Sequence, residues 1–259
     1  MGVSGLKLER ETGRRRGPLQ DLSGATGVIL AGGLGTRLRP VVADRPKVLA
    51  PVLGRPFLAY LLDQVATAGL RDVVLCTGYL GEEVRIAFGD AHGHVRLAYS
   101  RESSPLGTAG ALRAALPLVS TDTMLVLNGD SYCEADFRAL EAFHRASGAV
   151  ATIGLVQVAD TRRYGRVQTD AAGRVLGFEE KGTAAGPGWI NAGLYLLERR
   201  LVQSIPAKGP VSLEREVFPA WIGRGLHGHR SEGRFIDIGT PESYAAAEAF
   251  FADRERADS

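Results

Sequence analysis

The stretch GVILAGGLGTRLRP, residues 27–40, places a short apolar run directly before a glycine-rich segment that carries an arginine. The run from Val28 to Ala31 is typical of a buried strand, and three of the next four residues are glycine. Glycine lets a backbone approach a ligand closely, and arginine binds phosphate through two parallel N–H donors. A strand that ends in such a loop predicts a phosphate site at the carboxyl end of a sheet.

Short apolar runs alternate with amphipathic segments from residue 27 onward. This alternation is typical of a mostly parallel sheet with helices on both faces. In the first half we expect strands at 27–31, 72–79, 95–100 and 123–128, and helices at 55–69, 81–88, 107–117 and 135–147. The sequence therefore predicts an α/β fold with a Rossmann-like, mixed, mostly parallel sheet flanked by helices.

The second half has a different texture, with longer extended segments and one clear hairpin. The residues 170–173 predict the turn of that hairpin, because Asp and Gly favour tight turns. Further strands are expected at 149–160, 189–198, 225–231 and 234–239, and helices at 212–222 and 241–253. We expect these elements to extend the same sheet rather than to form a second domain.

The composition excludes several classes of protein. The chain has 259 residues, 45% hydrophobic and 23% charged, which is ordinary for a globular protein. Its net charge of +2 comes from residues 1–24, which hold five cations and three acids, so a basic face for nucleic acid is not expected. No apolar stretch is long enough to predict a membrane span. Cys76 and Cys133 lie in or beside apolar segments and predict reduced thiols in a cytoplasmic protein.

The ends of the chain carry weaker signals than its centre. Residues 1–25 include the arginine-rich RETGRRRGP without an apolar segment behind it, so a secretory signal is not expected. We expect a mobile extension there, one domain over 26–253, and a short tail over 254–259. His227 and His229 alternate on a strand-like segment, and we expect both to face solvent rather than to bind a metal.

Two familiar glycine motifs do not fit the opening stretch. A P-loop would close with Gly-Lys-Ser or Gly-Lys-Thr, but Thr36 and Arg37 follow Gly35. A dinucleotide-binding fingerprint would have glycine where Leu38 stands. The plain alternative is a solvated loop with incidental cations, and its position after a strand argues against it.

The loop resembles the signature of the sugar-1-phosphate nucleotidylyltransferases, which join a nucleoside triphosphate to a sugar 1-phosphate and release pyrophosphate. Motifs similar to those of this family follow in its order, so the resemblance extends from the loop to the last expected helix. They are PLGTAGAL (105–112), LVLNGDS (125–131), RYG (163–165), FEEK (178–181), NAG (191–193) and DIGTPESY (237–244). The resemblance implies a single nucleotidyltransferase domain with two small-molecule substrates, and whether the chain forms a homo-oligomer stays open.

The phosphate chemistry explains why cations are needed. A sugar phosphate must attack a triphosphate of like charge, so cations and backbone N–H groups must offset the repulsion. The resemblance assigns Arg37 and Lys47 to phosphate binding and transition-state charge, with Asp130 as the third catalytic residue. It places the nucleotide on Leu30, Ala31, Gly32, Gly33, Gly35, Thr36, Arg37, Glu102, Gly107 and Thr108.

Asp130 and Asp237 each close an apolar strand, and two converging carboxylates suit Mg²⁺. In the resembled family the matching pair holds this metal; the alternative is that Asp130 caps a turn and Asp237 pairs with an arginine. The resemblance assigns the sugar and its phosphate to Gly165, Glu180, Lys181 and Asn191. Carboxylate and amide groups suit sugar hydroxyls, whereas a surface ion pair is the alternative for FEEK.

Glu102 is the residue expected to choose the base. A carboxylate can accept from the adjacent N1–H and N2–H₂ donors of guanine, and the thymidylyl branch of the family typically has glutamine here. Three segments, at 44–63, 126–137 and 235–244, most resemble the D-glycero-α-D-manno-heptose 1-phosphate guanylyltransferases, and this resemblance implies GTP and a heptose 1-phosphate. The alternatives are a mannose-1-phosphate guanylyltransferase, a UTP- or dTTP-using relative, and a non-catalytic regulatory module that binds nucleotide sugars.

Overall fold

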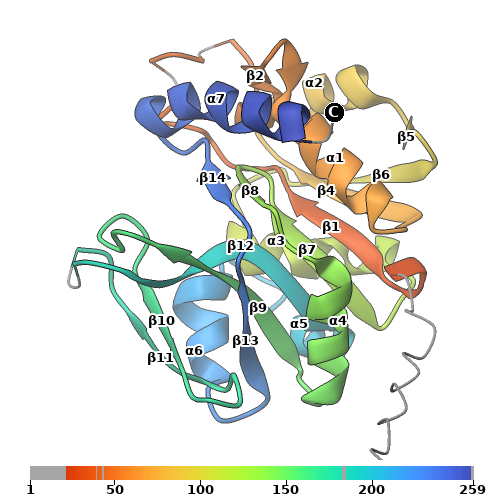
Figure 1. Cartoon of the computed structure of the whole chain (residues 1–259). Helices are drawn as coiled ribbons and strands as arrows, with labels where there is room; N and C mark the ends of the chain where they lie inside the picture. The colour runs from red at the N-terminus through yellow and green to blue at the C-terminus, as the bar shows by residue number, and fades with distance from the viewer. Residues whose placement is uncertain (1–21, 39, 43, 183–184, 258–259) are drawn as a thin grey trace, which may run out of the picture.

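A sheet of eight strands runs through the centre of the molecule (Figure 1). The computed structural model describes residues 22–38, 40–42, 44–182 and 185–257. The strands are β1 (Thr26–Leu30), β4 (Asp72–Thr77), β5 (Ala91–His92), β6 (Val95–Arg101), β7 (Thr123–Asn128), β9 (Ala151–Val158), β12 (Gly188–Glu198) and β13 (Leu226–Ser231). Their order is β13-β9-β12-β7-β1-β4-β6-β5. Only the pairings made by β12 and β5 are antiparallel, so the predicted mixed, mostly parallel sheet is confirmed.

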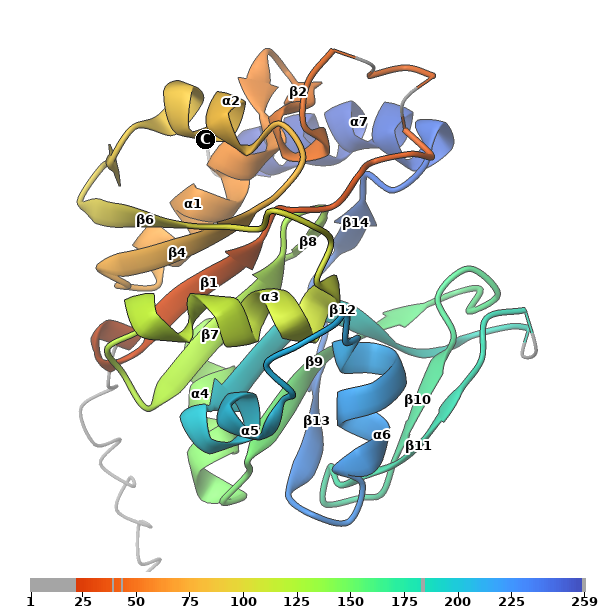
Figure 2. The ribbon, with the colours of Figure 1, turned by 180° about the vertical axis from the view of Figure 1, so that it is seen from behind.

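Helices cover both faces of this sheet (Figures 1 and 2). One face carries α1 (Phe57–Thr67), α2 (Gly81–Phe88), α4 (Phe137–Ala146) and α7 (Pro241–Ala257), and the other carries α3 (Gly107–Ala115), α5 (Arg199–Ser204) and α6 (Phe218–Ala220). Successive side chains of a strand point to opposite faces. Accordingly, Ile29 of β1 packs in the core beneath α1 and α7, whereas its neighbour Val28 packs beneath α3.

Three two-stranded sheets complete the fold. β8 (Ser131–Cys133) pairs with β14 (Phe235–Asp237), β10 (Arg166–Thr169) with β11 (Val175–Glu179), and β2 (Pro51–Val52) with β3 (Arg55–Pro56). The β10–β11 hairpin turns where Asp170 and Gly173 predicted it, and the Asp170 side chain accepts from the backbone N–H of Ala172 and of Arg174. Short 3₁₀ turns are η1 (Leu22–Gly24), η2 (Lys47–Leu49) and η3 (Leu116–Leu118), and η4 (Leu213–Val217) is a π-helical turn.

Several expected boundaries are wrong in detail. Leu22 and Ala25 are buried in the core rather than part of a mobile extension; residues 1–21 lie outside the described residues. The helix expected at 212–222 is divided into η4 and α6, and α7 continues to Ala257, beyond the expected end at 253. Residues 258–259 of the expected tail are likewise outside the described part.

The two histidines of β13 do not face solvent as expected. His227 is 9% exposed, and His229 is partly buried. Both rings pack against Phe143 of α4, with ring centroids 6.1 Å and 5.2 Å away. The sequence alternation was read correctly as a strand, but α4 covers the face on which these side chains lie.

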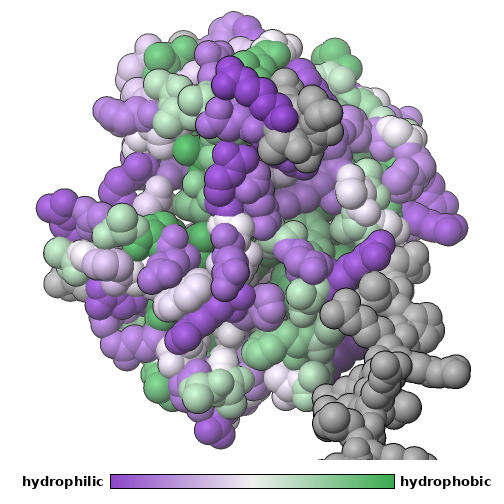
Figure 3. Space-filling model, in the orientation of Figure 1, coloured by the Kyte–Doolittle hydropathy of each residue, from purple (hydrophilic) through white to green (hydrophobic). Residues whose placement is uncertain are grey.

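Hydrophilic side chains cover most of the face seen in Figure 1, with smaller apolar areas between them (Figure 3). Cys76 and Cys133 are both buried and unpaired with each other. Within the described ranges, none of the helices has the length and apolar character needed to cross a membrane.

Candidate functional site

A cavity of about 290 Å³ lies at the carboxyl ends of β1 and β7, beside the N-terminus of α3. Parallel strands expose their carboxyl ends along one edge of a sheet, where ligands of such folds bind. Nine of the residues that the sequence singled out line it: Leu30, Ala31, Gly32, Gly33, Lys47, Glu102, Gly107, Thr108 and Asp130. The structure therefore brings most of the predicted nucleotide set to one place.

The glycine loop is held close to the neighbouring strands by backbone hydrogen bonds. The N–H of Ala31 donates to the carbonyl of Cys76 at 2.8 Å, and the N–H of Gly129 donates to the carbonyl of Leu30 at 2.9 Å. A Cβ at Gly32 would lie 2.6 Å from Oε1 of Glu102. Gly32 is therefore needed for the close approach of the Glu102 carboxylate to the loop.

Lys47 and Asp130 form the central ion pair of the site. The Lys47 ammonium lies 2.6 Å from Oδ2 of Asp130, across a separation of 83 residues. Burial acts to raise the pKa of Asp130, but the charge and hydrogen bond of Lys47 outweigh it, so this pKa lies below its usual value. The charge of Arg37 acts in the same direction. Asp130 is thus an ionised carboxylate beside two cations.

Arg37 and its neighbours lie beside the cavity rather than in its lining. Arg37 and Thr36 are exposed, and Gly35 has φ of 60°, in the region that favours glycine. The distance from an added Cβ at Gly239 to Nη2 of Arg37 is 3.7 Å. The Arg37 guanidinium is therefore at the strand end that carries Asp237.

Asp237 lies beside Asp130 because β14 pairs with β8. The N–H of Ile238 donates to the carbonyl of Asp130 at 2.9 Å, which joins the two strand ends directly. The Asp237 carboxylate accepts from the Tyr164 hydroxyl at 2.5 Å, from Nη2 of Arg163 at 3.2 Å and from the N–H of Gly239 at 2.7 Å. Burial and the bond to Asp237 raise the pKa of Tyr164, so its hydroxyl stays protonated and donates.

The two aspartates differ in how they could serve a magnesium ion. Asp237 is 9% exposed and pairs with Arg163, as the alternative interpretation of this residue has it, whereas Asp130 is more accessible. Mg²⁺ takes hard oxygen ligands and uses few protein carboxylates, completing its shell with phosphate oxygens and water. Oδ1 of Asp130 accepts only from the neighbouring Ser131 hydroxyl among the described contacts, at 3.2 Å, and the Asp130 side chain is 39% exposed. This oxygen is therefore accessible to a metal.

Glu102 forms one wall of the cavity. Its Oε2 accepts from the backbone N–H of Leu106 at 2.8 Å, which orients the carboxylate, and Oε1 faces Gly32. Burial raises the pKa of Glu102, and the bond from Leu106 only partly offsets this. The result is a fixed acceptor whose charge is sensitive to pH.

The residues expected to bind the sugar lie outside the lining of this cavity. Gly165 has φ of 77°, and a Cβ there would lie 2.5 Å from the carbonyl of Glu179, so it packs against the end of β11. Glu180 and Lys181 follow that strand and are exposed. The Asn191 amide donates to the Tyr195 hydroxyl at 3.0 Å and accepts from the N–H of Gly193 at 2.8 Å. Its oxygen retains one lone pair for a further donor.

Four residues of the site were not singled out from the sequence. Tyr164 holds Asp237, Asn128 lines the cavity, and Tyr195 and Glu214 bond to each other behind it. Tyr164 and Asn128 lie inside the motifs RYG and LVLNGDS, which could have indicated them. Tyr195 and Glu214 read as parts of an ordinary strand and helix.

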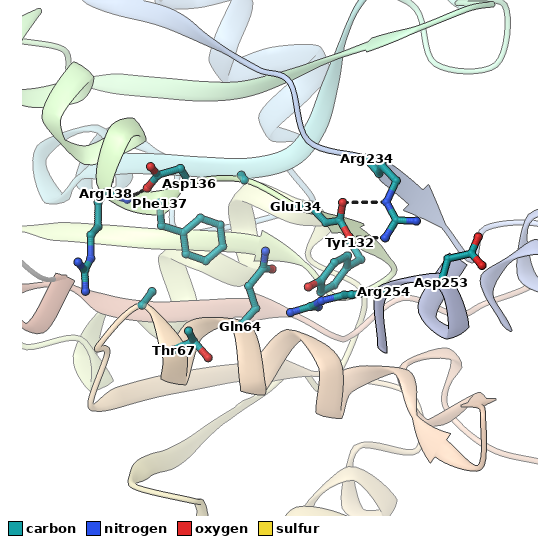
Figure 4. A pocket seen from close by; sticks show the side chains of 12 residues that line it. Gln64, Thr67, Tyr132, Glu134, Asp136, Phe137, Arg138, Arg234, Asp253 and Arg254 are labelled. Atoms are coloured by element: carbon teal, nitrogen blue, oxygen red, sulfur yellow. Dashed lines mark hydrogen bonds and ion pairs between the residues drawn. The ribbon is translucent and has the colours of Figure 1, made fainter. Parts of the chain in front are cut away.

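A second, larger cavity of about 760 Å³ lies between α1, the start of α4 and α7 (Figure 4). In its lining, Nη2 of Arg234 lies 2.7 Å from Oε1 of Glu134, and the Asp136 carboxylate caps α4. None of the glycine loop, Lys47 or Asp130 lines it. The smaller cavity is therefore the candidate site, because the glycine loop, Lys47 and Asp130 converge there.

Comparisons with known proteins identify the family of the chain. Residues 26–254 match the family model described as nucleotidyl transferase. The chain is 40% identical over 226 residues to the mannose-1-phosphate guanylyltransferase of Mycobacterium tuberculosis, covering 86% of this chain and 63% of that relative. It is 34% identical over 222 residues to the D-glycero-alpha-D-manno-heptose 1-phosphate guanylyltransferase of Aneurinibacillus thermoaerophilus, covering 85% of this chain and 96% of that relative. The chain thus spans less than two thirds of the first relative.

Two solved structures have the same fold. HddC from Yersinia pseudotuberculosis, complexed with GMP-PN, is 31% identical with a TM-score of 0.76, covering 88% of this chain and 99% of that one. A putative glucose-1-phosphate thymidylyltransferase from Bacillus anthracis, in complex with a sucrose, is 25% identical with a TM-score of 0.78, covering 87% and 95%.

Proposed function

The chain belongs to the nucleotidyl transferase family, and from this premise we propose that it transfers GMP from GTP to a sugar 1-phosphate, giving a GDP-sugar and pyrophosphate. The single observation that carries the proposal is the cavity in which Glu102, Lys47 and Asp130 meet the glycine loop. It combines an acceptor for guanine donors with cations and backbone N–H groups for phosphates.

The proposed sugar is D-glycero-α-D-manno-heptose 1-phosphate. Its support is the similarity of the segments 44–63, 126–137 and 235–244 to heptose 1-phosphate guanylyltransferases, together with the relative of that name at 34% identity. Mannose 1-phosphate is the second candidate, favoured by the relative at 40% identity. The two sugars differ by one exocyclic carbon that bears a hydroxyl.

The chemistry of the transfer follows from the charges at the site. An oxygen of the sugar phosphate attacks the α-phosphorus of GTP, the bond from that phosphorus to the bridging oxygen breaks, and pyrophosphate leaves with the electron pair. Arg37 and the loop N–H groups bind the departing β- and γ-phosphates, and Lys47 offsets charge on the reacting phosphate. Glu180, Lys181, Asn191 and the backbone at Gly165 orient the sugar phosphate.

Asp130 and Asp237 would hold Mg²⁺. When bound, the ion supplies charge neutralisation for the two phosphate-bearing substrates. The Tyr164 hydroxyl and the N–H of Gly239 keep the Asp237 carboxylate in a fixed orientation. The Ser131 hydroxyl donates to the Asp130 carboxylate and likewise holds it in a fixed orientation.

A matrix of substrates tests the proposed function. Pyrophosphate release is measured with GTP, ATP, UTP or dTTP against heptose, mannose and glucose 1-phosphates, with and without MgCl₂. We expect turnover with GTP and the heptose, dependent on Mg²⁺. Turnover with mannose 1-phosphate alone would select the second sugar. Binding of GDP-sugar without turnover in any combination would identify a regulatory module instead of an enzyme.

The substitution Glu102→Gln tests the assignment of the base. A carboxylate offers two acceptors to the N–H donors of guanine, whereas an amide offers one acceptor and one donor. The substitution therefore replaces one hydrogen bond to guanine by two donors that face each other. We expect kcat/KM for GTP to fall about 100-fold and the preference over dTTP to shrink. Kinetics with both nucleotides check this, with Glu82→Gln on α2 as the matched exposed control. An unchanged GTP preference would contradict the role of Glu102.

The pKa of Glu102 also predicts how nucleotide binding depends on pH. Because burial raises this pKa, the carboxylate takes up its proton at a higher pH than a free glutamate does. As the pH falls from neutral, we expect the KM for GTP to rise, since the protonated group loses an acceptor. The Glu102→Gln variant is neutral throughout and should show a flat profile over the same range. Parallel profiles for the two proteins would contradict this prediction.

A further inference from the structure

A chain of hydrogen bonds connects Thr108, which lines the cavity, with Asn191, which lies outside the lining. On the nucleotide side, the Thr108 hydroxyl donates to Oε2 of Glu214 at 2.9 Å. On the sugar side, the Tyr195 hydroxyl donates to Oε1 of the same carboxylate at 3.1 Å, and the Asn191 amide donates to the Tyr195 oxygen at 3.0 Å. We infer that Glu214 is a positioning residue that holds the nucleotide-binding and sugar-binding elements in one geometry. This inference rests on the proposed function.

The polarity of the network is fixed by the chemistry of Glu214. Both of its oxygens accept, so the hydroxyl protons of Thr108 and Tyr195 point toward it. The Tyr195 oxygen is then left as an acceptor, and the Asn191 amide must turn its NH₂ group inward. The Asn191 oxygen consequently faces the N–H of Gly193, at 2.8 Å, and keeps its second lone pair available.

Asn128, which lines the cavity, belongs to the same network. Burial and the charge of Glu214 raise the pKa of the Tyr195 hydroxyl, and the Asn191 and Asn128 side chains act to lower it. Gly193 leaves space for this amide, since a Cβ there would lie 2.8 Å from Nδ2 of Asn128. Oδ1 of Asn128 is buried without a partner among the described residues.

Further hydrogen bonds fix the nucleotide branch of the network, which runs from Glu214 to Thr108 and the start of α3. The N–H of Leu213 donates to the Thr108 oxygen at 2.8 Å, and the Ser212 hydroxyl donates to Oε2 of Glu214 at 3.0 Å. The carbonyl of Val211 accepts from the N–H of Ala109 at 2.9 Å. The segment before and within η4 therefore clamps the first turn of α3, where Gly107 and Thr108 face the nucleotide. Tyr195, with no exposed surface, provides a rigid link from this clamp to β12.

Two substitutions separate the branches. Tyr195→Phe removes the link to Asn191 but leaves Thr108 bonded to Glu214, so we expect the KM for the sugar 1-phosphate to rise about tenfold and GTP affinity to stay within about twofold. Glu214→Gln keeps the shape of the side chain but places an NH₂ group among hydrogen-bond donors. We therefore expect the KM for the sugar 1-phosphate to rise and the affinity for GTP to fall, each about tenfold. Glu216→Gln is the matched control on the same turn, because within the described part of the chain its Oε1 accepts from the N–H of Ser212, and glutamine retains that acceptor.

GTP binding is measured by calorimetry, steady-state constants by pyrophosphate release, and folding by thermal melting. A lower melting temperature for Glu214→Gln with unchanged KM values and GTP affinity would overturn the inference, because the residue would then support only the fold. Equal losses in both branches for Tyr195→Phe would also overturn it. If the wild-type protein turns over no sugar phosphate, the proposed function fails separately, and the calorimetric comparison of Glu214→Gln with Glu216→Gln still decides the nucleotide branch.

Discussion

Replacing Asp130 by asparagine is expected to lower kcat by about a thousandfold or more, because it removes a negative ligand at the proposed Mg²⁺ site. The amide preserves shape and one acceptor oxygen, so the loss falls on charge rather than on packing. It also leaves the Lys47 ammonium, 2.6 Å away, without its counter-charge. Turnover is measured over a titration of MgCl₂, and we expect the concentration needed for half-maximal rate to rise.

The matched control for this variant is Asp122→Asn. Asp122 precedes the opposite end of β7, and its side chain is 92% exposed, so the same chemical change should leave turnover unaffected. Thermal melting of both variants distinguishes catalysis from stability. An Asp130→Asn protein that melts early while its folded fraction retains full activity would show that Asp130 is structural.

Replacing Arg37 by alanine is the second large effect, expected to lower kcat/KM by roughly 100- to 1,000-fold, because a cation on the leaving phosphates acts mainly in the transition state. Arg37 is exposed, so folding should not change. Arg37→Lys keeps the charge but loses the two-pronged donor, and we expect it to recover only part of the rate. Single-turnover kinetics with GTP and the preferred sugar phosphate measure this directly.

Arg45→Ala is the control for Arg37. Arg45 lies in the same loop region, but its guanidinium bonds to Asp44 at 2.9 Å and 2.8 Å, on the surface. Its removal should have little effect, because exposed ion pairs contribute little. If Arg37→Ala and Arg45→Ala reduce the rate equally, the effect reflects general surface charge rather than a phosphate contact.

The strands and most helices could be predicted because their signals are local. The apolar run before the glycines predicted β1, and the alternation of apolar and amphipathic segments predicted the mixed sheet. Short elements were not predicted, because α5 has six residues and β8 three, which is too few to show a periodic pattern of apolar residues. Within the segment 212–222, Glu214 accepts from Thr108 and from Ser212, and a contact with a residue as distant in the chain as Thr108 leaves no signal in the local pattern.

The sequence by itself determined the order of the motifs, the strand that carries the glycine loop and the residue types that suit phosphate, guanine and metal. Only the tertiary structure decided which side chains contact one another. Lys47 reaches Asp130 across 83 residues, Tyr164 reaches Asp237 across 73, and Thr108 reaches Glu214 across 106. The physical reason is that periodicity reports which face of an element is buried, whereas a site depends on strand order and on which side chains satisfy one another at the strand ends.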